Sequence, residues 1–393
     1  MAETLLTSQF IELQKILCCP RTKSALSLIT VSELLKRLPP EEHARVPKGT
    51  TGAFVSETSS VAYPIVGRIL DFLEQDSLQM SPGLRDGHVE VDRQTESILQ
   101  SVKRWYDDFG WQRNAGGIYN DTAIFSQASL TAHGFYELSS HLSLLSRLSG
   151  GEFVLDAASG PLAHPENLAY SWFYRYRVCV DISLTALQEA DARLGGKGFC
   201  CLGDICQLPF RDGVFDGVVS AYTIQHIEKA RQGTAVSELY RVLKPGAHLC
   251  VISSIEHTPA HRALVLAIRA IRKALRLFDV DTPQFQERSG SSLPPHRLYA
   301  HEPDLAWWRR LARGLTDSYG VKGFRLFTRE EFESLFGDSM RAAKAARALE
   351  ALFPAIAATM FVYIMVDLAK TKVPLDSRQV EPENVPTLDK VEN

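Results

Sequence analysis

Apolar and polar positions follow different patterns before and after residue 151. From residue 151 onward, short apolar runs alternate with amphipathic stretches, which predicts a parallel sheet covered by helices on both faces. Residues 96–148 have helical patterns rich in Tyr, Trp and Phe, and the apolar run 360–366 predicts a closing strand. We therefore expect an α/β protein with a doubly wound sheet.

The remaining patterns set the expected boundaries. Residues 10–17 have the pattern of a short helix, and strand-like stretches follow up to Leu70, which predicts a small α+β module. Polar sequence with Pro and Gly follows as a linker, and a proline- and charge-rich tail is expected to be disordered. The expected units are 1–75 (module), 76–95 (linker), 96–372 (main domain, with its core at 151–256 and a helical lid insertion at 258–320) and 373–393 (tail).

Composition excludes several classes of protein. The apolar fraction of 45% and charged fraction of 23% are typical of globular proteins, and a net charge of -3 argues against a nucleic-acid partner. No apolar run reaches the roughly 18 residues of a membrane span, and the start lacks a signal-peptide layout. The seven cysteines form no C-x-x-C pair, so we expect reduced thiols, no metal site and a cytoplasmic location.

Three carboxylates stand where successive strand patterns end. They are Asp156, Asp181 and Asp204, and the tight-turn sequence Ser159-Gly160-Pro161 follows the first. Parallel strands bring their carboxyl ends to one edge, where such sheets bind ligands, and an acidic residue after the second strand typically holds ribose hydroxyls. The alternative is that each Asp only caps a following turn. A dinucleotide oxidoreductase would need G-x-G-x-x-G here, and that is absent.

The motifs as a series resemble the class I S-adenosylmethionine-dependent methyltransferases. They are 203–210 (Gly-Asp-Ile-Cys-Gln-Leu-Pro-Phe), 215–220 (Phe-Asp-Gly-Val-Val-Ser) and 238–246, which ends in Lys-Pro-Gly. The resemblance implies a Rossmann-like, seven-stranded, mostly parallel sheet and S-adenosylmethionine as cofactor. It also implies these cofactor contacts: Asp156, Ala158 and Gly160 at the methionine moiety, Asp181 and Ile182 at the ribose, and Asp204 and Ile205 at the adenine. Tyr119 or Tyr106 is expected in the pocket wall, with a place in the aromatic core as the alternative. The family's first loop is Asp-x-Gly-x-Gly-x-Gly, and this chain departs from it with Ala158 and Leu162.

Methyl transfer from a sulfonium is a direct displacement that requires alignment and, for some acceptors, a base. His226, after the fourth strand pattern, is the expected base, with a capping histidine as the alternative. We expect a small-molecule or lipid-linked acceptor, and the basic helical pattern near 262–276 leaves peripheral membrane contact open. Oligomeric state is not indicated. Two alternatives remain: methylation of tRNA or a translation-related protein, and a methyltransferase-like binding protein without catalysis.

The amino-terminal segment has a second resemblance. Cys18-Cys19-Pro20-Arg21-Thr22-Lys23, followed by Tyr63-Pro64-Ile65-Val66-Gly67, is similar to the Trm112-type zinc-ribbon module. Thr22 stands where that family has its second cysteine, and Cys19 is the one candidate ligand, whereas a structural zinc site needs about four. The resemblance implies a degenerate, metal-free module that serves in docking or stabilisation.

Overall fold

The computed structural model describes residues 10–80, 93–125, 131–276, 297–352 and 360–371, and all structural statements refer to these residues. Within them, twelve strands form one continuous sheet. The strands are β1 (Ser27–Thr30), β2 (Thr50–Ser56), β3 (Val61–Val66), β4 (Ile69–Asp71), β5 (Leu78–Gln79), β6 (Gly151–Ala157), β7 (Tyr174–Asp181), β8 (Gly198–Leu202), β9 (Gly217–Ala221), β10 (His248–Ser254), β11 (Tyr319–Arg325) and β12 (Tyr363–Ala369).

The sheet is doubly wound and mostly parallel in its central part, as predicted. The order is β1-β2-β3-β4-β8-β7-β6-β9-β10-β12-β11, and β5 pairs with β3. Pairs from β4·β8 through β10·β9 are parallel, whereas β12 runs antiparallel to both β10 and β11. The chain leaves β6 toward β7 on one side and later returns to β9 on the other. The gap between the loops that follow β6 and β9 is therefore the topological switch point, where this class of sheet binds ligands.

Helices connect the strands and flank the sheet. They are α2 (Val31–Arg37), α3 (Pro40–His43), α4 (Arg93–Trp105), the π-helix η2 (Tyr106–Gly110), α5 (Asn120–Phe125), α6 (Ala132–Leu142), α7 (Pro165–Ala169), α8 (Leu184–Leu194), α9 (Gln232–Val242), α10 (Pro259–Arg276), α11 (Leu305–Leu315), α12 (Arg329–Phe336) and α13 (Met340–Leu352), with short 3-10 turns such as η4 (Ile224–His226). None of the described helices has both the length and the apolarity to cross a membrane.

Both faces of the central sheet are buried because successive strand residues point to opposite sides. In β7, Val178 and Val180 join the core cluster on one face, and Cys179 joins the cluster on the other. This explains the nearly continuous apolar runs of the sequence. All seven cysteines are buried and none forms a disulfide.

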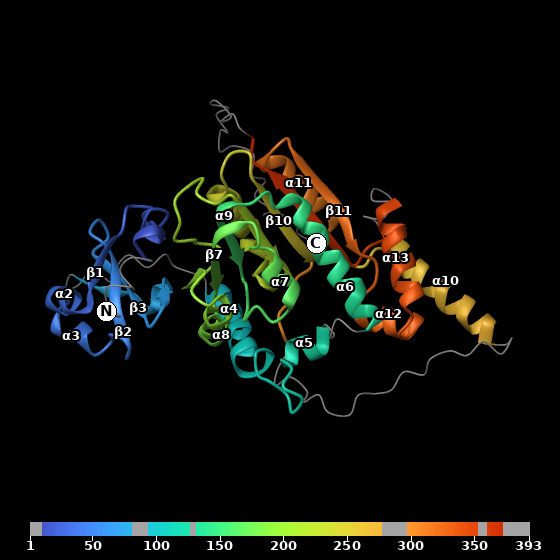
Figure 1. Ribbon diagram of the computed structural model, residues 1–393, viewed down its shortest axis with the longest axis horizontal. Helices are drawn as coiled ribbons and strands as arrows, with labels where there is room; N and C mark the ends of the chain where they lie inside the picture. The colour runs from blue at the N-terminus through green and yellow to red at the C-terminus, as the bar shows by residue number, and fades with distance from the viewer. Residues whose placement is uncertain (1–9, 81–92, 126–130, 277–296, 353–359, 372–393) are drawn as a thin grey trace, which may run out of the picture.

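The amino-terminal strands extend the main sheet, which the sequence boundaries did not anticipate. β4 pairs in parallel with β8, with Leu70 opposite Cys201. The backbone N–H of Cys18 also donates to the carbonyl of Pro209 at 2.9 Å, and Phe10 belongs to the same core cluster as the central strands. Figure 1 shows these strands, in blue, at one end of the molecule, and α10, α12 and α13 at the other. The two parts therefore share one sheet and one core.

The structure describes only part of the lid region and of the linker that the sequence predicts. In the expected lid region, α11 packs against β11 and β12 and carries Trp308, which is fully buried, so this helix belongs to the core. The middle of that region (277–296), most of the expected linker (81–92) and the expected tail (from 373) lie outside the described residues.

Candidate active site

A cavity of about 410 Å³ opens at the carboxyl ends of β6, β7, β8 and β9. Its wall is made by the loops after these strands, by α4, η2 and α6, and by residues at the end of β11 and the start of β12. The volume falls within the roughly 300–1,000 Å³ typical of small-molecule sites. The cavity thus occupies the switch point of the sheet.

The loop after β6 has the backbone of a glycine-rich turn although two of its positions carry side chains. Ala158, Gly160 and Leu162 have φ angles of 57°, 55° and 53°, respectively. These are the three positions at which the family's loop has glycine. A left-handed residue with a Cβ costs about 1–2 kcal/mol. Leu162 is 1% exposed and packs with Leu187, so burial of its side chain offsets that cost.

Gly160 lies where a side chain would collide with a neighbouring ring. A Cβ there would lie 2.9 Å from the ring of Trp111, which also lines the cavity. Its backbone N–H donates to Oδ2 of Asp181 at 2.8 Å. The loop after β6 and the end of β7 are therefore fixed to each other by this residue.

The Asp181 carboxylate has a structural role and is also available to a ligand. Its Oδ1 accepts from the backbone N–H of Ser183 at 2.9 Å, which begins the turn into α8. Each carboxylate oxygen keeps a further lone pair, and both Asp181 and Ile182 line the cavity. Burial raises the pKa of Asp181 to about 6, against the lowering effect of the two backbone N–H donors. Capping and ligand binding are therefore compatible at this position.

Asp204 lies in the cavity wall with Ile205, and it too is tied to its surroundings. Its Oδ1 accepts from the backbone N–H of Cys206 at 2.8 Å, and its Oδ2 accepts from Nη2 of Arg231 at 2.7 Å. Arg231 is itself a lining residue, 27 positions further along the chain. The sequence motif gave no indication of this pairing.

Asp156 borders the cavity, but its carboxylate forms an ion pair with the buried guanidinium of Arg177 on β7. Arg177 is 1% exposed, and its Nη1 donates to the carbonyl of Asn167. This pair neutralises a charge beneath the first loop. The contact expected between Asp156 and the methionine moiety stays a prediction.

Tyr119 is placed behind the cavity wall. It is not among the lining residues, although its ring lies edge-on to Trp111, with 6.0 Å between the ring centroids. Its hydroxyl accepts from Arg113 and Arg193, each at 2.9 Å, and donates to Glu189. The position of Tyr119 favours support of Trp111 over direct ligand contact.

His226, the expected base, lies in the cavity wall within η4. Its Nδ1 is 2.8 Å from the carbonyl oxygen of Tyr299, so this nitrogen carries the proton and donates. Burial lowers the pKa of His226, which leaves the ring neutral near pH 7 and Nε2 unprotonated. The amide nitrogen of Gln225 lies 3.5 Å from Nε2 and donates to it through a long hydrogen bond. A neutral imidazole with an unprotonated nitrogen is the state that a general base requires.

The other end of the cavity contains a polar cluster that sequence reasoning missed. Arg325, at the end of β11, is 3% exposed and lies over the rings of Tyr363 at 4.4 Å and Tyr222 at 5.4 Å. Its Nη2 donates to the Tyr222 hydroxyl at 3.0 Å, and its Nη1 lies 3.1 Å from Oε1 of Glu137. Nε is buried and has no hydrogen-bond partner among the described residues. A charged residue within a weak strand pattern was the one signal in the sequence.

The cluster continues to His141 on α6. Its Nε2 is 3.0 Å from the Tyr222 hydroxyl, and its Nδ1 contacts the Tyr170 hydroxyl. Burial lowers the pKa of His141 to about 3, so it is neutral at pH 7. Burial opposes the charge of Arg325, but Tyr222 and Glu137 outweigh it and raise the pKa of Arg325. Tyr222 has a φ of 56°, a strained backbone of the kind that concentrates at functional sites.

The central part of this chain is similar in sequence to known proteins. A family model described as a methyltransferase domain matches residues 155–251. The demethylmenaquinone methyltransferase of Mycobacterium tuberculosis H37Rv is 30% identical over 182 residues, which span 43% of this chain and 74% of that protein. The enzyme of the same name from Corynebacterium glutamicum is 38% identical over 104 residues, 26% of this chain and 42% of that protein. Among solved structures, Haemonchus contortus phosphoethanolamine N-methyltransferase 2 with S-adenosyl-L-methionine is 16% identical, covers 69% of this chain and 60% of that chain, and has a TM-score of 0.41.

Proposed function

Because this chain belongs to the class I S-adenosylmethionine-dependent methyltransferases, we propose that it methylates a small, planar, oxygen-bearing acceptor in the cavity described above. The family supplies the reaction type and the cofactor. The acceptor class comes from the polar cluster around Arg325. The relatives named demethylmenaquinone methyltransferase are consistent with such an acceptor.

The residues at one end of the cavity fit the cofactor. The left-handed loop brings backbone close to the ligand, and Gly160 leaves open the space that a Cβ would fill. In this proposal Asp181 accepts hydrogen bonds from the ribose hydroxyls, and Asp204 with Ile205 borders the adenine. Bound S-adenosylmethionine supplies an electrophilic methyl group.

The observation on which the acceptor class rests is the unpartnered donor on Arg325. Nε is buried without a hydrogen-bond partner among the described residues, whereas Nη1 is ion-paired with Glu137. Leaving such a donor unpaired costs about 1–3 kcal/mol, and a phenolate, enolate or carboxylate oxygen removes that cost. The rings of Tyr222 and Tyr363 beside the guanidinium favour a flat acceptor that stacks on them.

His226 acts as base on an acceptor hydroxyl. Its unprotonated Nε2 takes the hydroxyl proton as the acceptor oxygen forms the bond to the methyl carbon. The bond between that carbon and sulfur breaks in the same step, and the electron pair stays on sulfur. The proton then leaves from His226 to solvent. Arg325 stabilises the negative charge that develops on the acceptor oxygen.

The test is methyl transfer from radiolabelled S-adenosylmethionine to matched pairs of aromatic compounds, with and without a ring hydroxyl. We expect turnover only with the hydroxylated member of each pair. Arg325→Met should raise the acceptor KM at least tenfold, with the dissociation constant for S-adenosylhomocysteine unchanged, and Arg325→Lys should recover part of the loss. An unchanged KM in Arg325→Met refutes this acceptor site. Cofactor binding without turnover on any acceptor class supports the non-catalytic alternative.

A further inference from the structure

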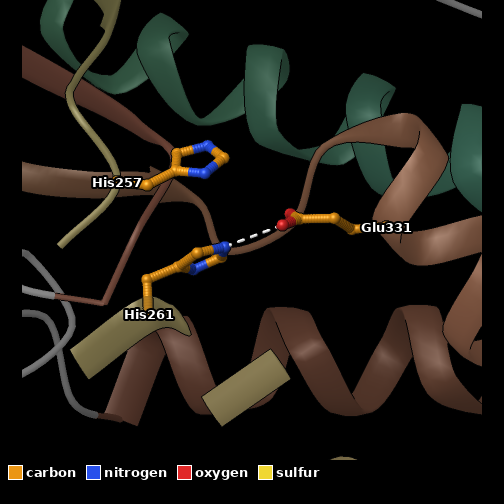
Figure 2. Close-up of side chains that lie close together, drawn as sticks. All are labelled: His257, His261 and Glu331. Atoms are coloured by element: carbon orange, nitrogen blue, oxygen red, sulfur yellow. Dashed lines mark hydrogen bonds and ion pairs between the residues drawn. The ribbon is translucent and has the colours of Figure 1, made fainter. Parts of the chain in front are cut away.

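Three potential metal ligands converge outside the residues assigned to methyl transfer. His257 lies between β10 and α10, His261 in the first turn of α10, and Glu331 in the first turn of α12. One nitrogen or oxygen atom from each lies within 4.8 Å of the other two. Figure 2 shows the two imidazole rings and the carboxylate directed toward a common space.

The orientation of His261 is that of a metal-binding histidine. Its Nδ1 lies 2.7 Å from the carbonyl oxygen of Met360 and therefore carries a proton. A ligating histidine is typically held in this way, with one ring N–H on a carbonyl and the other nitrogen directed to the metal. Here the other nitrogen, Nε2, is 2.9 Å from Oε1 of Glu331. The imidazole is 1% exposed, so its direction is fixed by packing.

Glu331 is held equally firmly. The backbone N–H of Thr328 donates to its Oε2 at 3.0 Å, and the backbone N–H of Glu331 donates to the Thr328 hydroxyl at 3.1 Å, which completes a capping box. This arrangement uses Oε2 and leaves Oε1 facing His261. An imidazole nitrogen and a carboxylate oxygen are both acceptors, and a contact of 2.9 Å between them requires a proton or a metal cation between the two atoms.

The position of His257 favours a metal cation over a proton between His261 and Glu331. An imidazolium–carboxylate pair needs only His261 and Glu331. A second imidazole, with its ring centroid 4.9 Å from that of His261, is not needed by such a pair. A metal ion uses both rings. Two histidines and one carboxylate are an established set for divalent first-row transition metals, including zinc.

We infer that His257, His261 and Glu331 form a binding site for a divalent transition-metal ion of the zinc type. Ligand atoms about 2.0–2.2 Å from such an ion lie roughly 3–3.4 Å apart, depending on the coordination geometry. Small side-chain movements from the present positions, chiefly of the partly exposed His257, give that spacing. Three protein ligands leave at least one coordination position open to water or a ligand. This inference is independent of the proposed function.

The test uses the full chain without a polyhistidine tag, stripped with chelator and titrated calorimetrically with ZnSO₄. We expect one equivalent to bind the wild type, and His257→Ala and Glu331→Gln to weaken binding at least tenfold. His43→Ala, which removes an exposed imidazole in the amino-terminal part, is the matched control and should bind like the wild type. Visible absorption of the Co²⁺-loaded protein supplies a second readout, because the d–d bands report nitrogen and oxygen ligation.

His257→Ala is the decisive variant because it leaves the His261–Glu331 pair intact. A circular dichroism spectrum and a Tm like those of the wild type in the metal-free state establish that it is folded. Loss of Zn²⁺ binding and of the Co²⁺ bands in this folded variant supports the site. Equal binding by His257→Ala and the wild type, or no saturable binding by the wild type at 100-fold molar excess of Zn²⁺, overturns it.

Discussion

Replacing Asp181 with Asn is expected to weaken cofactor binding and to remove most of its dependence on pH. The carboxylate carries a full charge and accepts from backbone N–H groups through both oxygens, so its free lone pairs are the acceptors offered to the ligand. A hydrogen bond to a charged group contributes about 1.5–3 kcal/mol. Loss of one such bond corresponds to an increase in the dissociation constant of about 10- to 100-fold.

The pH dependence gives a sharper test than the affinity alone. Burial raises the pKa of Asp181 to about 6. Between pH 7.5 and pH 5 the wild-type carboxylate therefore becomes protonated and loses charge, so affinity for S-adenosylhomocysteine should fall as the pH falls. Asp181→Asn has no proton to gain at this position, and its weaker affinity should change much less over the same range. Calorimetric titration of both proteins at several pH values measures this.

A structural loss must be separated from a loss of ligand contact, and Asp216→Asn provides the control. Asp216 also accepts backbone N–H bonds, from Glu152 at 2.9 Å and Phe153 at 3.0 Å, and it pairs with Lys244 at 2.8 Å. It does not line the cavity. Asp216→Asn should lose stability and keep the wild-type dissociation constant with its pH dependence. Equal affinity of Asp181→Asn and the wild type at pH 7.5 would falsify the ribose assignment.

Two further substitutions test the role of His226 as a base and the loss of folding stability caused by the buried carboxyl of Asp71. His226→Ala should lower kcat by about 10²–10⁴, the usual contribution of a general base, with unchanged cofactor affinity. Turnover by this variant at the wild-type rate in single-turnover assays excludes the role. Burial raises the pKa of Asp71 to about 7, so the folded wild type loses stability as the pH rises from 4 to 7 and this carboxyl ionises. Asp71→Asn should therefore exceed the wild type in free energy of unfolding by up to about 4 kcal/mol at pH 8 and differ little at pH 4, as measured by urea denaturation. An equal difference at both pH values contradicts this reasoning.

The sequence was sufficient to predict the central sheet and the position of Asp181 and Asp204 at one edge of it. Buried parallel strands require nearly continuous apolar runs, and their carboxyl ends must meet at one edge, so the sequence alone places these two carboxylates together. The backbone of the first loop could not be predicted. Leu162 adopts a left-handed conformation because its side chain is buried against residues of α8, and that packing is visible only in three dimensions.

The polar end of the cavity was missed because its residues come from distant segments. Glu137 lies on α6, Tyr222 follows β9 and Arg325 ends β11, so no local spacing connects them. The continuity of the sheet through β4 was also hidden, since strand pairing between segments about 130 residues apart leaves no local pattern. A histidine pair at positions 257 and 261 was visible in the sequence, but its third member, Glu331, is brought near only by the packing of α12 against α10.

The two ends of the cavity carry groups of opposite charge, carboxylates at one end and a guanidinium at the other, and this difference suits methyl transfer. At the proposed cofactor end, the buried Asp181 and the partly exposed Asp204 are held by backbone N–H groups and by Arg231, which leaves lone pairs for hydroxyl and amine donors. At the other end, the buried guanidinium of Arg325 has an unpartnered Nε to offer to the proposed acceptor oxygen. In the proposed reaction the sulfonium loses its positive charge, and the partial negative charge that develops on the acceptor oxygen as its proton leaves is lost when the bond to methyl forms. A cation beside that oxygen must therefore bind the acceptor without making the oxygen's electron pair unavailable for the bond to methyl. The ion pair between Arg325 and Glu137 meets this requirement because the carboxylate weakens the positive electrostatic field of Arg325.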